Sequence, residues 1–307
     1  MIACKSIAET GDTIMTKKIT IIGATGHLGH RVTAKLVEKG AEVTAIVRDP
    51  VTAKSALPAE VRLVHGDVSD PGSLKSALQG TETLYITLNT ESLDTTLPFH
   101  TEREGVINVV AAAKEAGVQH IMQIAGVDTA YPEFSTEGMA YGTNAIRQGG
   151  IDAIKTSGIP YTFFYCSFFL DSLPKFLMDN QLAVIGNHVH PIWFTNSSDL
   201  ADLVFNAIDN DAAKNKEFAV QGQEAKTYTE GATEFLKAYA PEAEVIRLPM
   251  EAVGQMGLPE EQAAFIEHLL TFVQQLKEEQ VDSETREVLG SPKHTISSFA
   301  EELRGEI

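Results

Sequence analysis

Three glycines at the end of an apolar segment constrain this chain more than any other feature of its sequence. Residues 19–31 read ITIIGATGHLGHR, so that a β-branched run meets Gly23, Gly26 and Gly29, and helix-forming residues follow. Gly23 permits a sharp turn, Gly26 lets backbone N–H groups approach a pyrophosphate, and Gly29 lets the next helix pack closely on the strand. The start of that helix offers unpaired N–H groups and a partial positive charge. The segment predicts an anion site rather than a plain glycine-rich turn, because both the strand and the helix are present.

The order of strand, turn and helix is that of dinucleotide-binding folds, although the spacing is G-x-x-G-x-x-G rather than the commoner G-x-G-x-x-G. We predict that the turn binds a dinucleotide through Gly23, Thr25, Gly26, His27, Leu28 and Gly29. Arg48 comes first after the second predicted strand, where an arginine accommodates a 2′-phosphate. This favours NADP(H) over NAD(H). In the alternative, Arg48 is a solvated loop residue and Asp49 leaves room for NAD(H).

Polar residues also follow the next two predicted strands. Asp67 and Val68 come after the third strand, where Asp67 can accept a hydrogen bond from the adenine amino group and Val68 can pack on the ring. The alternative for Asp67 is an Asx-type turn, with Asp70 capping the next helix. Leu88 and Asn89 end the fourth strand, and the carboxyl ends of parallel strands line the ligand crevice. Asn89 is therefore placed to meet the ribose or the nicotinamide.

Strands alternate with helices through the first half of the chain, which indicates a doubly wound parallel sheet of Rossmann type in the α/β class. The predicted strands are residues 19–22, 42–47, 61–64, 83–88, 120–124 and 160–164. The predicted helices are residues 30–39, 71–79, 100–116 and 141–157, the last broken at Gly149-Gly150. We assign residues 17–165 to the dinucleotide-binding core.

The pattern is less regular over residues 166–307, which we assign to a smaller substrate or cap lobe of α/β type, interleaved with the core and ending in acidic helices. Short strands are predicted over residues 182–185, 189–194, 217–220 and 244–248. Helices are predicted over residues 196–206, capped at Ser197 or Ser198, and over residues 229–239. The aromatic cluster at residues 165–169 is expected to be core rather than a pocket wall.

Composition excludes several classes of protein. The 307 residues carry a net charge of −18, which argues against a nucleic-acid partner and against an anionic membrane surface. Two cysteines, Cys4 and Cys166, cannot form a disulfide framework, so a reducing cytoplasm is expected. Residues 1–16 lack the pattern of a secretory signal, and we interpret them as a disordered leader or as a wrongly assigned start, with Met15 the natural first residue.

Several motifs together resemble the NmrA-like family, an atypical branch of the short-chain dehydrogenase/reductase superfamily. They are IIGATGHLG at residues 21–29, VRDP at 47–50, GD at 66–67, AAKEAGV at 112–118 and SGIPYT at 157–162. The resemblance covers nearly all of the chain from Lys17 onward. It implies an NAD(P)-binding protein, monomeric or dimeric. Members range from NAD(P)H-dependent quinone and isoflavone-type reductases to redox-sensing regulators that bind NADP without turnover.

The usual catalytic residues of the superfamily are missing. In the Tyr-x-x-x-Lys motif the lysine lowers the pKa of the tyrosine, which moves a proton. No tyrosine here has a lysine four residues later, and Ala125 occupies the position of the serine. Many family members instead carry a lysine and a glutamate at the positions of Arg147 and Ile151. Arg147 can hydrogen-bond the cofactor but is a poor general acid. No catalytic residue is assigned, and no metal is expected, because His188 and His190 lack a third ligand nearby.

Two functions therefore remain open. The first is an oxidoreductase that passes hydride from NADPH to a small acceptor such as a quinone, for which orientation and exclusion of water suffice. The second is a non-catalytic sensor that reads NADP/NADPH and changes its affinity for a protein partner. Sugar-nucleotide epimerisation ranks last, because it needs the missing proton-transfer pair.

Overall fold

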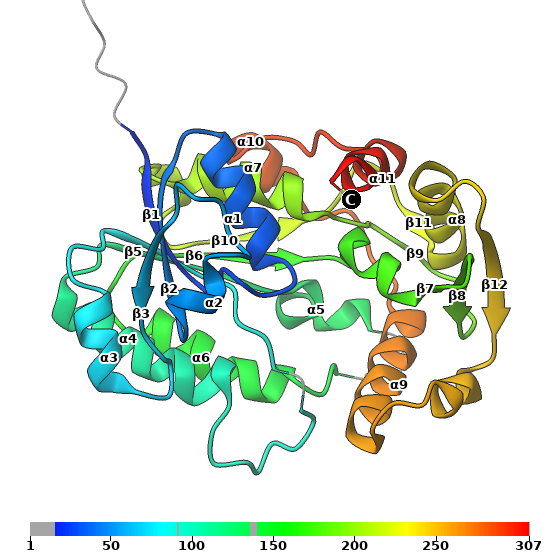
Figure 1. The fold of residues 1–307 in the computed structure, drawn as a ribbon, viewed down its shortest axis with the longest axis horizontal. Coiled ribbons are helices and arrows are strands. Elements are labelled where there is room, and N and C mark those ends of the chain that lie inside the picture. Colours follow the sequence, from blue (N-terminus) through cyan, green and yellow to red (C-terminus); the bar gives the residue numbers. More distant parts are fainter. Residues whose placement is uncertain (1–15, 91, 136–139, 307) are drawn as a thin grey trace, which may run out of the picture.

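The computed structural model describes residues 16–90, 92–135 and 140–306, so the proposed leader, up to and including Met15, lies outside the described residues. Within these ranges, seven parallel strands form one sheet in the order β10-β6-β5-β4-β1-β2-β3 (Figure 1). The strands are β1 (Lys18–Ile22), β2 (Glu42–Val47), β3 (Arg62–His65), β4 (Thr83–Ile86), β5 (His120–Gly126), β6 (Tyr161–Cys166) and β10 (Lys216–Val220). The predicted parallel α/β sheet is thus confirmed.

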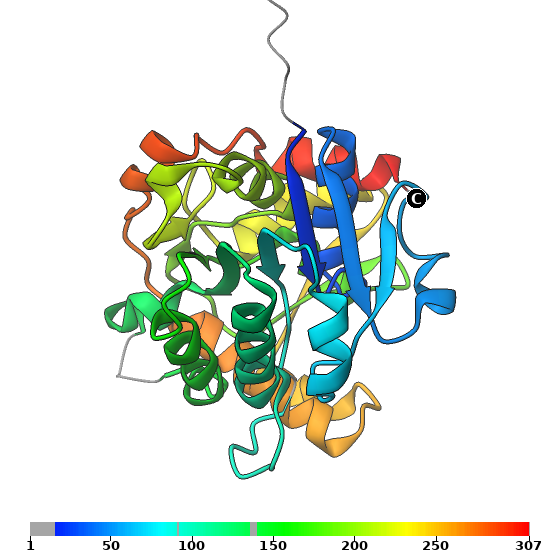
Figure 2. The same cartoon turned by 90° about the vertical axis from the view of Figure 1, so that its left-hand side faces the viewer.

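Helices cover both faces of this sheet (Figure 2). They include α1 (Gly29–Glu38) and α7 (Ser197–Ala207) on one face, and α3 (Pro71–Ala77), α4 (Val106–Ala116) and α6 (Asn144–Lys155) on the other. Each face has its own apolar core, because strands covered on both sides bury side chains of both orientations. Because both faces of each strand are buried, the strands read as continuous apolar runs in the sequence.

The order of the strands reverses between β1 and β4, where the chain first goes outward through β2 and β3 and later returns to the other side of β1. Ligands of open α/β sheets bind in the crevice outside the carboxyl ends of the strands at such a switch point. The glycine turn follows β1 at this position. The topology therefore places the predicted dinucleotide residues along one edge of the sheet.

A second group of elements packs around its own apolar core beside the sheet. Its strands are β7 (Leu177–Met178), β8 (Gln181–Ile185), β9 (Pro191–Ile192), β11 (Lys226–Thr227) and β12 (Glu244–Leu248). Its helices are η4 (Leu170–Phe176), α8 (Tyr228–Tyr239), η6 (Met250–Gln255), α9 (Glu260–Gln275) and α11 (Ile296–Gly305). The short helices elsewhere are α2 (Pro50–Ala53), η1 (Thr101–Gly105), α5 (Val127–Ala130), η2 (Pro132–Phe134), η5 (Asp211–Ala213) and α10 (Ser283–Val288). Since β10 and α7 return to the large sheet, the two halves of the chain are interleaved.

The predicted break at Gly149-Gly150 is wrong, because α6 runs through both glycines. A Cβ on Gly150 would lie 2.3 Å from the backbone oxygen of Glu102, and one on Gly149 would lie 2.9 Å from Cγ of Arg103. The two glycines allow η1 to lie directly against α6. They are a packing requirement, whereas the sequence pattern indicates a helix breaker.

Several other boundaries differ from the prediction, and β4 for example ends at Ile86 rather than at Leu88. The first turn of the helix expected from His100 is η1, a wide π-type turn, before regular α-helix begins at Val106. The strand expected over residues 189–194 shortens to β9. The helix expected at residue 196 is capped by Asn196, whose side chain accepts from the N–H of Asp199, rather than by either serine. Both serine hydroxyls bond elsewhere, Ser197 to Asp171 and Ser198 to Glu302.

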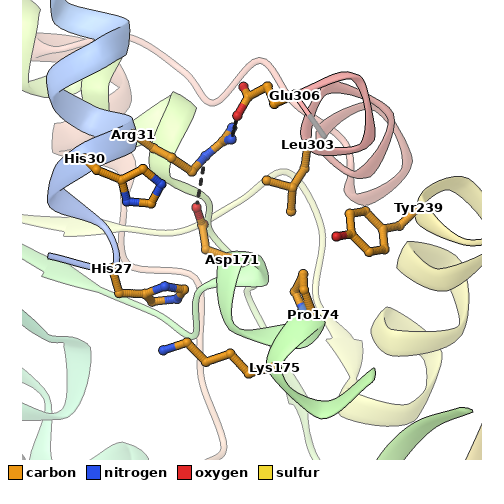
Figure 3. A pocket seen from close by; sticks show the side chains of 9 residues that line it. All are labelled: His27, His30, Arg31, Asp171, Pro174, Lys175, Tyr239, Leu303 and Glu306. Atoms are coloured by element: carbon orange, nitrogen blue, oxygen red, sulfur yellow. Dashed lines mark hydrogen bonds and ion pairs between the residues drawn. The ribbon is translucent and has the colours of Figure 1, made fainter. Parts of the chain in front are cut away.

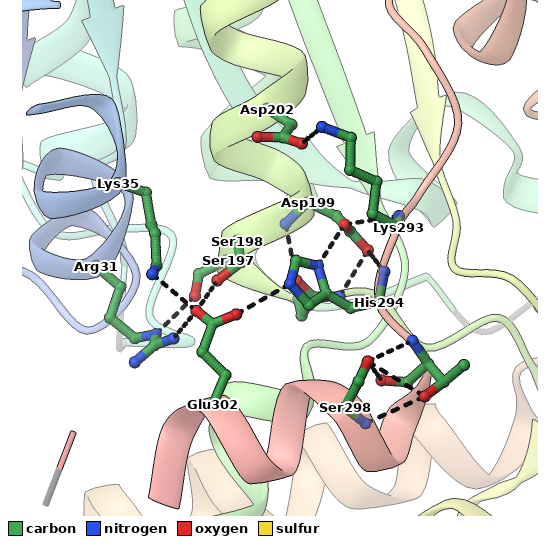
Figure 4. A network of polar contacts seen from close by, with 12 residues as sticks. Arg31, Lys35, Ser197, Ser198, Asp199, Asp202, Lys293, His294, Ser298 and Glu302 are labelled. Carbon is green, nitrogen blue, oxygen red and sulfur yellow. Dashed lines mark hydrogen bonds and ion pairs between the residues drawn. The ribbon is translucent and has the colours of Figure 1, made fainter. Parts of the chain in front are cut away.

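A buried polar network joins α11 to α1 and α7, which pack on the large sheet (Figure 4). Arg31 of α1 is 5% exposed, donates to Oγ of Ser197 at 2.9 Å and pairs with Glu302 of α11 at 3.3 Å. Lys35, one turn further along α1, lies 3.0 Å from the same carboxylate. Helix α1, which follows the glycine turn, is therefore held in place by residues from the far end of the sequence.

Candidate functional site

Two of the three glycines in the turn are required by the protein itself. Gly23 has a φ of +92°, and a Cβ there would lie 2.3 Å from the backbone oxygen of Thr87. A Cβ on Gly29 would lie 2.1 Å from the backbone oxygen of Gly23. The predicted roles of these residues, a sharp turn and close packing of helix on strand, are confirmed by this geometry.

Gly26 is different, because the space beside it is open. A Cβ on Gly26 would meet only the oxygen of Gly23, at 3.1 Å, and the residue is exposed. The N-cap of α1 is the apolar Leu28, which cannot cap a helix with its side chain, and the first turn carries no acidic residue. The N–H groups and the positive end of α1 thus face an open space. These features fit a dinucleotide diphosphate.

Arg48 and Asp67 lie near one another, after the carboxyl ends of the neighbouring strands β2 and β3. Arg48 is exposed after β2, and its backbone oxygen is 3.0 Å from Nδ1 of His65 at the end of β3. Asp67 accepts from both the N–H and the hydroxyl of Ser69 at 2.8 Å, which confirms the Asx-type turn, and Asp70 caps α3 as predicted. The Ser69 hydrogen bonds and the charge of Arg48 lower the pKa of Asp67. A contact of Asp67 with adenine stays a prediction.

Val68, Leu88 and Asn89 border the same edge of the sheet. Val68 is half-buried and packs on Gly105, where a Cβ would lie 3.0 Å from it. Leu88 is half-buried and Asn89 is exposed, and the backbone oxygen of Asn89 accepts from the hydroxyl of Thr101 at 2.6 Å. The predicted contacts of these residues with the dinucleotide stay predictions.

Arg147 lies deeper than the other predicted residues. Its guanidinium is buried, with Nε 2.7 Å from Oε1 of Glu102 and Nη1 3.2 Å from Oδ1 of Asn144. A Cβ on Gly126 would lie 3.7 Å from Nη1, so the guanidinium reaches the end of β5. Its observed partners are side chains of the protein, and its contact with a cofactor stays a prediction.

The structure adds a polar cluster at the end of β5 that the sequence analysis missed. Asp128 is buried and accepts from the side-chain amide of Asn144, and burial raises its pKa. Tyr141 stacks on His268 of α9 at a ring distance of 5.4 Å, and burial raises its pKa. Asp128 follows a parallel strand, as Arg48 and Asn89 do. A search for polar residues just after the carboxyl ends of the predicted strands would therefore have identified it. No local pattern marks Tyr141.

The remaining candidates are part of the core. Cys166 is buried, which raises the pKa of its thiol and agrees with the predicted packed role. His188 is buried, lies 2.8 Å from the backbone oxygen of Ile185 and stacks on Tyr228. Across residues 16–90, 92–135 and 140–306, no three His, Cys, Asp or Glu side chains gather as a metal site would require. In the same ranges no helix has the length and apolar character needed to cross a membrane.

Comparison with known proteins identifies the family. The model of the NmrA-like family matches residues 15–296. The chain belongs to the NmrA-like family. Among curated relatives, the NAD(P)H azoreductase of Xenophilus azovorans is 24% identical over 292 residues, which cover 92% of this chain and 96% of that protein. Quinone oxidoreductase 2 of Escherichia coli is 28% identical over 252 residues, covering 79% and 83%.

Solved structures of other NmrA-like and related proteins have the same fold. The crystal structure of the NADPH-dependent quinone oxidoreductase of Escherichia coli complexed with NADPH is 25% identical, with a TM-score of 0.72, and covers 93% of this chain and 99% of that one. The triphenylmethane reductase of Citrobacter sp. complexed with NADP(H) has a TM-score of 0.72 at 21% identity, covering 94% and 99%. At 21% identity, the similarity to the triphenylmethane reductase shows only that the two proteins share a fold.

Proposed function

We propose that this NmrA-like protein is an NADPH-dependent oxidoreductase that reduces a small conjugated acceptor of the quinone class. The observation that carries the proposal is the open space at Gly26, next to the uncapped start of α1. A diphosphate bound there would accept hydrogen bonds from the backbone and complement the helix dipole. Two curated relatives, an azoreductase and a quinone oxidoreductase, are named for reductions of this kind, which supports the choice.

The residues along the edge of the sheet would divide the binding of NADPH among them. Arg48 would hold the 2′-phosphate, Asp67 and Val68 the adenine, and Leu88 with Asn89 the nicotinamide half. Bound NADPH would supply the hydride. A quinone needs little from the protein besides orientation and exclusion of water, so the missing Tyr-x-x-x-Lys motif is compatible with the reaction.

The neighbouring cluster at the end of β5 would border the acceptor. Burial raises the pKa of the Tyr141 phenol, which therefore stays protonated and can donate a hydrogen bond to an acceptor oxygen. The stacking of Tyr141 on His268 brings α9 of the smaller lobe to this cluster. The lobe would thereby shield the reacting atoms from water.

The experiment mixes the purified protein with NADPH or NADH and a panel of quinones and azo dyes, and follows the loss of reduced-nicotinamide absorbance. Calorimetry on the same sample measures binding of each nucleotide. We expect turnover with NADPH and a quinone. Tight binding without turnover on any acceptor would contradict the enzyme and favour the NADP/NADPH sensor, and absence of nucleotide binding would contradict both.

A further inference from the structure

The segment that joins α9 to α10, residues 276–282, crosses the large sheet at its carboxyl edge, and we call it the strap. It starts beside the chain that follows β5, where Leu276 forms an antiparallel bridge with Ser135. It ends at α10, which is attached to β10 because the Thr285 hydroxyl donates to the backbone oxygen of Ala219 at 2.6 Å. The strap therefore passes from the β5 side of the sheet to its β10 edge.

The side chain of Glu278 fastens the middle of the strap. Its Oε1 accepts a hydrogen bond from the hydroxyl of Ser167, the first residue after β6, at 2.6 Å. Its Oε2 accepts from the side-chain amide of Gln221, the first residue after β10, at 3.2 Å. The same oxygen accepts from the backbone N–H of Trp193, between β9 and α7, at 3.1 Å. One carboxyl group thus ties the strap to the ends of two neighbouring parallel strands.

Gln221 forms the second attachment of the strap. Its Nε2 also donates to the backbone oxygen of Glu279 at 2.9 Å, and its Oε1 accepts from the backbone N–H of Val281 at 2.9 Å. The exposed fractions of Glu278, Ser167 and Gln221 are 6%, 3% and 2%. Solvent is therefore largely excluded from the carboxyl group and from both strand ends that it contacts.

The three donors to Glu278 are all uncharged, so none of them neutralises an ionised carboxylate. Burial raises the pKa of Glu278 to about 7, and the negative charge of Asp128, after β5, adds to this effect against the lowering by the three hydrogen bonds. The carboxyl group is therefore mostly neutral in mild acid and mostly ionised in mild alkali. Next to Glu278 or its donors in the chain, the charged or titratable side chains are Lys277 and Glu279, both exposed, and Cys166, which is buried, while from α10 Arg286 pairs with Asp282 at 2.7 Å.

We propose that Glu278 is a proton-controlled clasp, which fastens the strap over the carboxyl ends of β6 and β10 while it is neutral and loosens the strap once it is ionised. A neutral carboxyl group can donate to the oxygen of Ser167 and still accept from Trp193 and Gln221. The ionised group keeps these three partners but carries a buried charge, which opening of the strap returns to water.

The position of the strap gives the clasp a consequence for the crevice. Ligands of open α/β sheets bind outside the carboxyl ends of the strands, so a strap that loosens there changes access to that edge. Glu278 would thus couple access to pH. The clasp goes beyond the proposed reductase function and does not depend on it.

The direction of the pH effect follows from the pKa of Glu278, which is raised on folding from 4.5 to about 7. The stabilisation of the closed strap is therefore fully present below the lower value and is lost as the pH rises through the higher one. Between about pH 6 and pH 8, the equilibrium between closed and open strap should shift about tenfold toward the open form.

Hydrogen exchange of the nucleotide-free protein at these two pH values tests the clasp, after correction for the intrinsic pH dependence of exchange. The reporters are the N–H groups of Lys277 and Val281, which donate to the backbone oxygen of Phe134 and to Oε1 of Gln221. We expect their protection to fall about tenfold from about pH 6 to pH 8. Equal protection at the two pH values would overturn the proposal.

Two matched variants assign the effect to Glu278. Glu278→Gln keeps the shape of the neutral side chain, and its amide can donate to Ser167 while its carbonyl accepts from the other two donors. Its strap should be protected equally at both pH values. Glu279→Gln removes the same charge from the exposed neighbour and should keep the tenfold fall. A fall that persists in folded Glu278→Gln would overturn the clasp.

A third variant tests the clasp without altering the strap. Asp128→Asn removes the negative charge that acts on Glu278, so the midpoint of the change in protection should move to lower pH. Thermal unfolding checks that each variant folds, and Asp128→Asn provides the answer should Glu278→Gln not fold. An unmoved midpoint in folded Asp128→Asn would assign the titration to another group and would also overturn the proposal.

Discussion

Nε2 of His294 lies 2.9 Å from a carboxylate oxygen of Glu302, and this contact fastens α11 to the segment that precedes it. On the other side of the ring, Nδ1 lies 2.7 Å from Asp199 of α7. Both ring nitrogens can donate only when the imidazole is protonated. The hydrogen bonds to Asp199 and Glu302 accordingly raise the pKa of His294 to about 9.

This contact predicts that the protein loses stability in mild alkali. The pKa of His294 is raised from 6.5 to about 9 on folding, so its contribution is fully present below pH 6.5 and is lost as the pH rises through 9. After allowance for solvent screening, we expect a loss of about 1–2 kcal/mol of unfolding free energy. Denaturant unfolding between these pH values measures it. His294→Gln should remove most of this dependence, and an unchanged slope in that variant would assign the effect to other groups.

We predict that substitutions in the glycine turn cause two different losses, one of NADPH binding and one of stability. Gly26→Val should fold normally, because a side chain there meets little of the protein, but it should no longer bind NADPH. Gly29→Ala places a Cβ against the Gly23 oxygen and should cost about 1–3 kcal/mol of stability. Calorimetry with NADPH and thermal unfolding distinguish the two effects. Normal NADPH binding by folded Gly26→Val would exclude this turn as the diphosphate site.

Arg48 predicts the choice of nucleotide. Arg48→Ala should weaken NADPH by about 1.5–3 kcal/mol, which corresponds to tenfold or more in affinity, and leave NADH nearly unchanged. The matched control is Arg62→Ala, because Arg62 begins the neighbouring strand β3 at the opposite edge of the sheet. Titration of both nucleotides by calorimetry gives the answer. An equal loss for the two nucleotides would remove Arg48 from the phosphate contact.

Because Arg147 and Glu102 form a buried ion pair, we predict that the effects of their substitutions on stability depend on one another. Arg147→Met leaves the buried carboxylate of Glu102 without its partner and should cost about 3–5 kcal/mol of stability. Adding Glu102→Leu removes both charges and should restore most of that loss. If Arg147 also contacts the cofactor, the restored double variant binds NADPH more weakly than the wild type. Wild-type affinity in the double variant would make the role of Arg147 purely structural.

The sequence pattern predicts the large sheet well because its signals are local. β-branched runs mark the buried strands, Gly117 ends α4 in the left-handed conformation that glycine favours, and Asp70 caps α3. The glycine turn is identified by its spacing, and the structure shows why two of its glycines cannot be replaced. The strand, capping and spacing signals themselves depend on neighbours within a few residues.

The errors come from contacts between distant segments. Gly149 and Gly150 have the pattern of a helix break, yet they make room for the Arg103 side chain and the Glu102 backbone of η1, which comes much earlier in the chain. Asn196 replaces the predicted serine caps because Ser197 and Ser198 bond to Asp171 and Glu302. The pocket beside the first turn of α1 was not predicted, because its walls come from four separate elements (Figure 3). Local periodicity carries no information about contacts between distant segments.

The pairing of Arg31 with Glu302 joins positions 271 residues apart. During translation, the glycine turn and α1 leave the ribosome long before this carboxylate has been synthesised. An incompletely paired buried guanidinium is costly, so the nascent first half should remain loosely packed while the rest of the chain is made. The glycine turn should therefore mature late in biosynthesis, although it is among the first segments to emerge.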